Sequence, residues 1–150
     1  MDKPGGSAST APGRPAIVGE LMRPAVTTVE RHAHLAAAAY LMKRAGDTAV
    51  VVTTDDASRR PIGIITETDI TNAVADGKNL NDSRIDELVG PGPVTTQPGT
   101  TVHEAAELML SAGIRHLPVV EDGRLVGIID VSDACRALLN AAAWVGPERR

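Results

Sequence analysis

A repeated phrase inside the chain constrains its fold more than any other feature. Residues 63–70 read GIITETDI, and residues 127–134 read GIIDVSDA, 64 positions later. A wider alignment places residues 20–52 on residues 87–119 without a gap, at a shift of 67. The three-residue difference falls in a polar turn, TTDDASRR against VEDGR, where insertions are tolerated. The chain therefore consists of two related units of about 55 residues, each too small to be secure alone.

Each unit shows the same order of expected elements: a short strand, a helix that ends at a glycine, two strands around a polar turn, and a second helix. In the first unit they lie near residues 27–29, 34–45, 49–53, 61–65 and from Thr66 onward. In the second unit they lie near residues 95–96, 101–112, 116–120, 125–129 and from Asp130 onward. The pattern predicts an α/β fold built from two β-α-β-β-α repeats.

Composition narrows the class of function. The net charge of −4 argues against a nucleic-acid partner, and one Trp, one Tyr and no Phe leave few platforms for base stacking. The single cysteine, Cys135, excludes an intrachain disulfide and favours a reduced, cytoplasmic setting. No apolar run is long enough to span a membrane, and residues 1–15 do not resemble a signal peptide. We expect a cytoplasmic protein that binds neither nucleic acid nor membrane.

The second copy carries a recognisable motif, GIRHLPVV followed by EDGRLVGII and then Asp133. This pattern resembles the CBS domain, the cystathionine beta-synthase regulatory module, and two copies in tandem resemble a CBS pair or Bateman module. The first copy is looser, with Val51 where the strand proline would stand. The resemblance implies a stand-alone pair whose repeats pack about a pseudo-two-fold axis. The expected parts are a disordered tail (1–16), repeat 1 (17–75), a linker (76–84), repeat 2 (85–142) and a C-terminal tail (143–150).

A strand meets a helix at Thr66-Glu67-Thr68-Asp69. The start of a helix offers free backbone N–H groups and the positive end of the helix dipole, which suit an anion. A carboxylate there can accept hydrogen bonds from a ribose diol, as acidic residues do in dinucleotide folds. The resemblance implies that Asp69 holds the ribose of an adenosine nucleotide and that Thr66 assists. The same spacing is also that of a helix-capping pair, and both roles can coexist.

The second corner reads Asp130-Val131-Ser132-Asp133. Asp133 keeps the ribose position and Ser132 lies beside it, whereas Asp130 replaces the threonine with a second carboxylate. That carboxylate is a good helix cap and would repel a phosphate unless a cation intervened. The second corner is therefore less suited to a phosphorylated ligand than the first.

Basic residues precede the strand of the second repeat, at Arg115 and His116. Arginine suits bidentate phosphate contacts, and the resemblance implies that this pair faces the cleft of Asp69. The equivalent residues of the first repeat, Thr48 and Ala49, are uncharged. The alternative is that both basic residues are solvated at a strand end. Further candidates for ligand contact are Thr28 and Ile114, and the adenine is expected near Ile114 and residues 50–52.

These observations lead to one expected function and its rivals. We expect a regulatory module that binds AMP, ADP or ATP between the repeats, forms a homodimer and acts on a regulated protein that the sequence does not identify. The alternatives are a scaffold that has lost ligand binding, or a binder of S-adenosylmethionine or NAD. No nucleophile, acid–base pair or metal cluster is evident, so we expect neither an enzyme nor a required cofactor. We expect His32 and His34 to be surface residues.

Overall fold

The computed structural model describes residues 14–143 and has the mixed α/β composition that the sequence predicts. Most of the predicted tail 1–16 and nearly all of the tail 143–150 lie outside the described residues. The first half contains α1 (Val18–Leu21), β1 (Thr28–Glu30), α2 (Leu35–Ala45), β2 (Ala49–Thr53), β3 (Pro61–Thr66) and α3 (Glu67–Ala75). The second contains the 3₁₀ turn η2 (Ile85–Glu87), α4 (Val102–Ala112), β4 (His116–Glu121), β5 (Arg124–Asp130) and α5 (Val131–Ala143).

The chain folds into two compact units. Among the described residues, unit 1 comprises 14–24, 95–121 and 127–143, and unit 2 comprises Ala25–Val94 with Asp122–Val126. Unit 2 holds the Thr66–Asp69 corner, and unit 1 holds the Asp130–Asp133 corner. The units differ from the sequence repeats, because the N-terminal segment up to Pro24 belongs with the second repeat.

Backbone hydrogen bonds show how the repeats exchange their first segments. In unit 1 the Val18 N–H donates to the carbonyl of Thr100 at 2.8 Å, and the Val102 N–H donates to the carbonyl of Ala16 at 2.9 Å. Unit 2 has the equivalent bonds, from Ile85 to Ala33 and from Leu35 to Ser83, both at 2.9 Å. The first segment of each repeat therefore lies against the body of the other repeat. The buried residues Val18 and Ile85 anchor the two exchanged segments.

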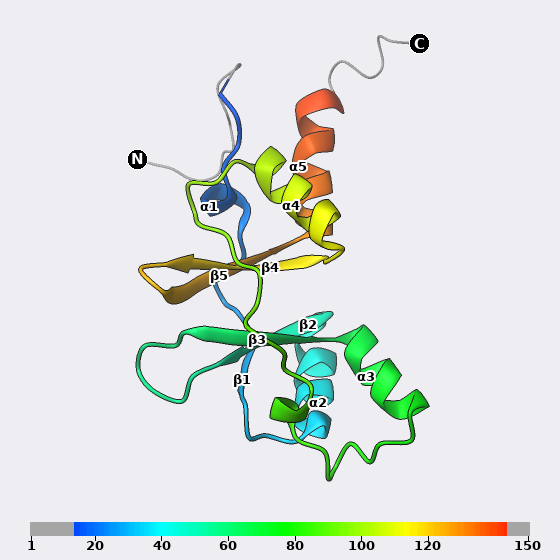
Figure 1. Cartoon of the computed structure of the whole chain (residues 1–150). Coiled ribbons are helices and arrows are strands. Elements are labelled where there is room, and N and C mark those ends of the chain that lie inside the picture. Colours follow the sequence, from blue (N-terminus) through cyan, green and yellow to red (C-terminus); the bar gives the residue numbers. More distant parts are fainter. Residues whose placement is uncertain (1–13, 144–150) are drawn as a thin grey trace. The chain divides into compact units, whose positions relative to one another are not determined.

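Unit 2 is built on a three-stranded sheet. β1 runs parallel to β2, and β2 pairs with β3 in antiparallel fashion, with Val50 opposite Ile65. Both α2 and α3 lie on one side of this sheet (Figure 1). The two helices and the sheet enclose a core of aliphatic side chains, because the sequence offers almost no aromatic residues. Its buried members are Val29, Leu35, Ala38, Met42, Val50, Val52, Ile65, Ala73 and Ile85.

Unit 1 has a two-stranded sheet of β4 and β5, with α4 packed against α5 (Figure 1). The weak strand predicted at residues 95–96 is reduced to one parallel bridge between Thr96 and Val119. Gln97 and Pro98 follow at once, and proline cannot donate to a ladder, so pairing does not extend. The helices of both units end as predicted, because Gly46 and Gly113 adopt left-handed φ values of 72° and 69°.

Candidate functional site

The corner in unit 2 is a reciprocal helix cap. The Thr66 N–H donates to Asp69 Oδ2 at 2.8 Å, and the Asp69 N–H donates to Thr66 Oγ1 at 3.2 Å. The Thr66 hydroxyl also donates to Asp69 Oδ2, at 3.1 Å. The Glu67 N–H donates to the carbonyl of Thr48 at 3.1 Å, which joins the start of α3 to the approach to β2. The capping interpretation of the Thr66–Asp69 spacing is confirmed.

The cap occupies only part of the Asp69 carboxylate. Its hydrogen bonds within residues 14–143 all reach Oδ2, and none of the ion pairs seen over that range involves Asp69. The side chain is half-buried. A carboxylate can accept about four hydrogen bonds in total. Asp69 can therefore cap α3 and still accept hydrogen bonds from a ligand.

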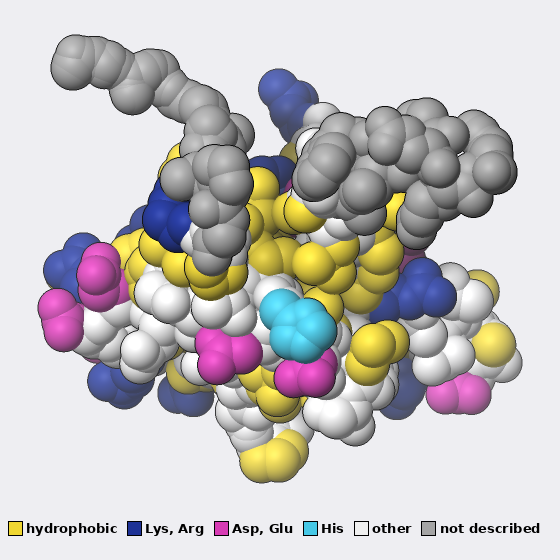
Figure 2. All heavy atoms as spheres, turned by 90° about the horizontal axis from the view of Figure 1, so that it is seen from above, with side chains coloured by type: hydrophobic (Ala, Val, Ile, Leu, Met, Phe, Trp, Pro, Cys, Tyr) yellow, Lys and Arg dark blue, Asp and Glu magenta, His cyan; other side chains and the backbone are white. Residues whose placement is uncertain are grey.

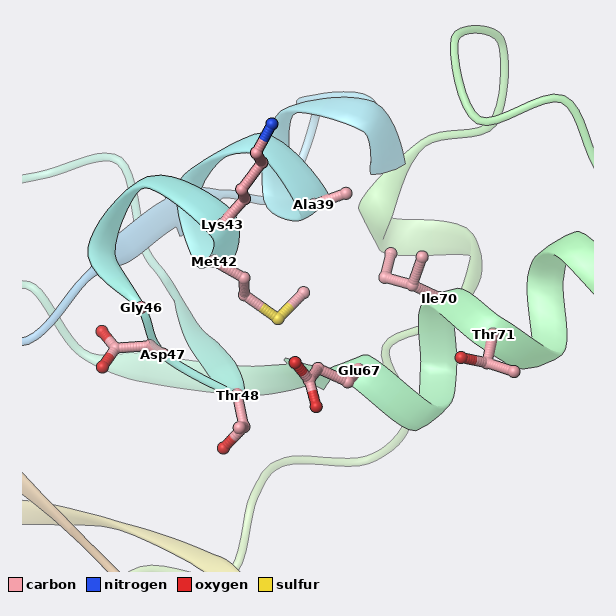
Figure 3. Close-up of a pocket in the computed structure, with 9 residues that line it drawn as sticks. All are labelled: Ala39, Met42, Lys43, Gly46, Asp47, Thr48, Glu67, Ile70 and Thr71. Carbon is pink, nitrogen blue, oxygen red and sulfur yellow. The ribbon is translucent and has the colours of Figure 1, made fainter.

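A pocket of about 540 Å³ adjoins this corner within unit 2 (Figure 3). It lies between the C-terminal end of α2 and the first turns of α3, with Met42 in its centre. The Thr27 hydroxyl donates to Asp47 Oδ2 at 3.1 Å and so fixes one wall. The pocket mixes apolar surface with charges of both signs. Its lining residues are Ala39, Met42, Lys43, Gly46, Asp47, Thr48, Glu67, Ile70 and Thr71.

The sequence alone did not predict that Lys43, Asp47 and Glu67 line a pocket. One signal was present, because Asp47 follows the helix-ending glycine where the other repeat has Ile114. A charged residue at an otherwise apolar repeat position marks a local difference between the two units.

The corner in unit 1 has the same construction. The Asp130 N–H donates to Asp133 Oδ2 at 3.0 Å, and the Asp133 N–H donates to Asp130 Oδ1 at 2.8 Å. The Val131 N–H donates to the carbonyl of Arg115 at 2.9 Å, as Glu67 does to Thr48 in unit 2. The repeated phrase in the sequence thus corresponds to a repeated strand-to-helix corner.

Arg23 distinguishes the unit 1 corner from its counterpart. Its Nη2 donates to Asp130 Oδ2 at 3.0 Å, and its Nε lies 3.6 Å from Asp133 Oδ2. On the other side, Arg136 Nη1 lies 3.4 Å from Asp133 Oδ1. Burial raises the pKa of Asp133 and the Asp130 carboxylate adds to this, whereas the Asp130 N–H and Arg23 act in the opposite direction.

Arg23 was also missed from the sequence. Its signal lies in the alignment at a shift of 67, where Arg23 meets Gly90 inside an otherwise similar phrase, ELMRP against ELVGP. The contact itself could not be foreseen, because it depends on the exchange of first segments between repeats.

The structure places the remaining predicted residues in both units. In unit 2, Thr28 begins β1 and pairs with Val51. In unit 1, Ile114 is partly buried, Arg115 and Ser132 are exposed, and His116 is 9% exposed at the start of β4. Thr66 and Asp69 are thus brought together, as are Ser132, Asp133 and the backbone of Arg115. The pairing of Arg115 and His116 with Asp69 stays a prediction.

The expected adenine surface at Val50, Val51 and Val52 is not available, since all three residues are fully buried. Val50 and Val52 belong to the core that α2 and α3 cover in unit 2. Aliphatic contacts to a base would have to come from residues with partial exposure, such as Ile114.

Residues 14–143 contain neither a metal-binding cluster nor a membrane-spanning helix. In that range no group of three or more His, Cys, Asp or Glu side chains is placed to hold a metal ion. No helix among these residues has the length and apolar character needed to cross a membrane.

Comparison with known proteins gives a consistent family. The model of the CBS domain family matches residues 18–76 and 85–140. An uncharacterized protein of Methanopyrus kandleri is 36% identical over 118 residues, which cover 77% of this chain and 59% of that protein. An uncharacterized 17.7 kDa protein of Acidianus ambivalens is 34% identical over 124 residues, which cover 82% of this chain and 73% of that protein. The chain thus spans about three fifths of the length of the first relative.

Two solved structures resemble this fold. One is a CBS domain protein of Pyrobaculum aerophilum complexed with AMP, with a TM-score of 0.76, 29% identity, and coverage of 85% of this chain and 98% of that chain. The other is a CBS-domain containing protein of Agrobacterium tumefaciens, with a TM-score of 0.76, 32% identity, and coverage of 86% and 98%.

Proposed function

The chain belongs to the CBS domain family as a tandem pair of repeats, and on this premise we propose that it is a regulatory module whose Asp69 binds the ribose of an adenine nucleotide. One observation carries the proposal: the cap of α3 engages Oδ2 of Asp69 and leaves Oδ1 without a partner among residues 14–143. The AMP complex of the Pyrobaculum aerophilum protein supports this class of ligand.

The ribose contact has a definite energetic scale. Hydrogen bonds to a charged acceptor contribute about 1.5–3 kcal/mol each. Loss of one such bond corresponds to a weakening of roughly 10- to 100-fold, because about 1.4 kcal/mol is a factor of ten. Asp69→Ala is therefore expected to weaken AMP binding by at least tenfold.

Arg115, which is exposed, is proposed as the phosphate contact, whereas the predicted contact from His116 would require this buried side chain to become accessible. Arginine binds phosphate bidentately, whereas adenosine offers no phosphate to bind. Arg115→Ala is therefore expected to weaken AMP and ATP binding and to leave adenosine binding unchanged. Equal weakening of all three ligands would contradict a phosphate role.

Thermal unfolding with AMP, ADP, ATP, NAD and S-adenosylmethionine tests the proposal. A ligand at 100 times its dissociation constant adds about 2.7 kcal/mol, which raises the Tm of a chain of this size by roughly 5–10 °C. The shift with an adenine nucleotide should fall to about half or less in Asp69→Ala, because a tenfold weaker ligand adds only about 1.4 kcal/mol at the same concentration. No shift with any ligand would favour the rival function, a scaffold that binds proteins without a nucleotide.

Glu104→Ala is the matched control for Asp69→Ala. At the start of α4, Glu104 Oε1 accepts the Thr101 N–H at 3.0 Å, and the Glu104 N–H donates to Thr101 Oγ1 at 3.1 Å. This is the same capping geometry at a helix start outside both corners. Each variant should lose about 1 kcal/mol from its cap, but only Asp69→Ala should show the reduced ligand shift.

We further propose that the protein forms a homodimer through its helices. Large apolar side chains stay exposed on them, at Tyr40 and Val74 in unit 2 and at Leu110 and Leu139 in unit 1. Figure 2, seen from the side of α4 and α5, shows hydrophobic side chains on this face. Exposed apolar surface of this kind favours association. Sedimentation should give twice the mass of the chain, and Leu110→Glu with Leu139→Glu should reduce it to the monomer.

A further inference from the structure

Arg23 is held in place by the backbone as well as by its charge. Its N–H donates to the carbonyl of Ile128 at 2.8 Å, and its carbonyl accepts the Ile128 N–H at 3.0 Å. This antiparallel bridge fixes Arg23 beside β5, two residues before Asp130. Met22, its neighbour, packs against Gly127, where an added Cβ would lie only 2.6 Å from the Met22 sulfur. The contacts of Met22 and Arg23 with β5 therefore hold the guanidinium next to the Asp130–Asp133 corner.

The guanidinium occupies the face that a ribose diol would need. A carboxylate binds a diol through lone pairs on both oxygens. At Asp133, Oδ2 accepts the Asp130 N–H and faces Arg23 Nε, while Oδ1 faces Arg136. Asp133 is also largely shielded, with 13% of its side chain exposed. The Arg136 side chain is 66% exposed and can move away from Oδ1, whereas Arg23 is anchored by its backbone bridge to Ile128. Arg23 is therefore the group that holds the corner closed to a ribose.

At the position of unit 2 that is equivalent to Arg23, no side chain is present to approach the aspartate. Arg23 corresponds to Gly90, and an added Cβ at Gly90 would meet nothing within 4 Å. The carboxylate of Asp69 is accordingly approached by the cap alone among residues 14–143. The two corners share one construction and differ in whether an arginine fills them.

We propose that Arg23 closes the Asp130–Asp133 corner to a ribose and thereby restricts nucleotide binding to the Asp69 corner, so that each chain binds one nucleotide. This inference rests on the proposed function. Arg23 is then the residue that decides which of two similar corners accepts the ligand.

Arg23 does not instead provide a phosphate site. Asp130 and Asp133 place two negative charges against the guanidiniums of Arg23 and Arg136, so both positive charges are already paired. An incoming phosphate would face the two carboxylates at close range, and like charges repel strongly where burial reduces screening. The arrangement excludes a phosphorylated ligand as well as its ribose.

Calorimetric titration of the full chain with adenosine tests the inference, because adenosine carries the ribose without a phosphate that Asp130 and Asp133 would repel. Wild type should bind one adenosine per chain, and Arg23→Gly, which introduces the residue found at position 90, should bind two. Arg14→Gly is the matched control, because it removes a cation from the same segment, where Arg14 pairs with Glu20 at 3.0 Å. The control should still bind one adenosine. A stoichiometry of two in wild type, or of one in folded Arg23→Gly, would overturn the inference.

An Asp69→Ala background separates this inference from the proposed function. Asp69→Ala should bind adenosine at least tenfold more weakly than wild type, Asp69→Ala with Arg23→Gly should bind one adenosine more tightly than Asp69→Ala does, and adding Asp133→Ala should abolish that gain. If the double variant binds no better than Asp69→Ala while wild type binds, Arg23 is not the barrier but the Asp69 proposal survives. If wild type does not bind and Arg23→Gly binds one adenosine, the Asp69 proposal fails and the role of Arg23 stands.

Two results guard the experiment against a folding defect. Circular dichroism establishes that each variant is folded, and Arg23→Gln, which keeps much of the aliphatic stem, replaces Arg23→Gly if the latter unfolds. Arg23→Gln should also raise the stoichiometry, because a neutral amide pairs more weakly with the carboxylates. If no folded variant binds adenosine or AMP, both proposals are overturned together.

Discussion

The Thr66–Asp69 and Asp130–Asp133 corners have the same backbone construction but different charged neighbours. Each caps a helix through an aspartate at its third position, and in each the first helical N–H donates to a carbonyl just before the neighbouring strand. One aspartate keeps an oxygen without a partner among the described residues, whereas the other lies between Arg23 and Arg136. The two corners therefore share a backbone construction and differ in the charged side chains that face the aspartate.

The difference arises from the segment that each repeat contributes to the other. Arg23 comes from the first repeat by sequence, yet it neutralises the corner of the second repeat within unit 1. The equivalent segment of the second repeat brings Gly90 toward unit 2. A single substitution in an exchanged segment can thus change a site whose own residues are unaltered.

The glycines that lead into the two corners give the largest expected difference in stability. A Cβ at Gly63 would lie 2.6 Å from Val89 Cγ1, and one at Gly127 would lie 2.6 Å from Met22 Sδ. Valine is stiff, whereas the methionine thioether can move aside. Gly63→Ala should cost about 1–3 kcal/mol of unfolding free energy, and Gly127→Ala should cost less. Urea unfolding measures both, and equal losses would contradict this account.

Removal of Arg23 should have a smaller effect. Its side chain is 42% exposed, so Arg23→Ala should cost about 1 kcal/mol or less at neutral pH. The guanidinium lowers the pKa of Asp133, so its loss raises that pKa further above the unfolded value. A raised carboxyl pKa costs stability as pH rises through it, so the deficit should shrink between pH 7 and pH 4. Gly90→Ala is the matched change, with no expected pH dependence.

The smallest effect is expected for Asp133→Asn. The asparagine oxygen can still accept the Asp130 N–H, so the cap is kept and the change at neutral pH should stay within about 0.5 kcal/mol. Because burial raises the pKa of Asp133, wild type should gain stability relative to the variant as pH falls toward 4. Urea unfolding at several pH values measures the difference. If the wild-type protein instead loses stability relative to the variant on acidification, the pKa of Asp133 is lowered.

Local patterns predicted most of the fold. Helical spacing and the two glycines placed α2 and α4, and β-rich runs placed β2, β3, β4 and β5 close to their observed limits. The short turns α1 and η2 were missed, because three or four residues carry no periodicity. The exchange of first segments was also missed, because only tertiary contacts decide whether a first segment packs against its own repeat or against the other.

The candidate site was predicted only in part. Thr66 and Asp69 lie three residues apart, so their hydrogen bonds follow from local geometry. The Arg23–Asp130 pair joins residues 107 positions apart, and no spacing rule reaches that far. Likewise, the burial of Val50 and Val52 depends on how α2 and α3 cover the sheet, which the strand pattern alone does not report.

The most direct test of the account is an amide NMR spectrum of the wild-type protein titrated with AMP. The account predicts that the backbone amides of Thr66 and Asp69 shift with saturation, while those of Asp130 and Asp133 stay in place. Shifts at Asp130 and Asp133 alone, or at both corners equally, would contradict the claim that one corner binds and the other is closed by Arg23.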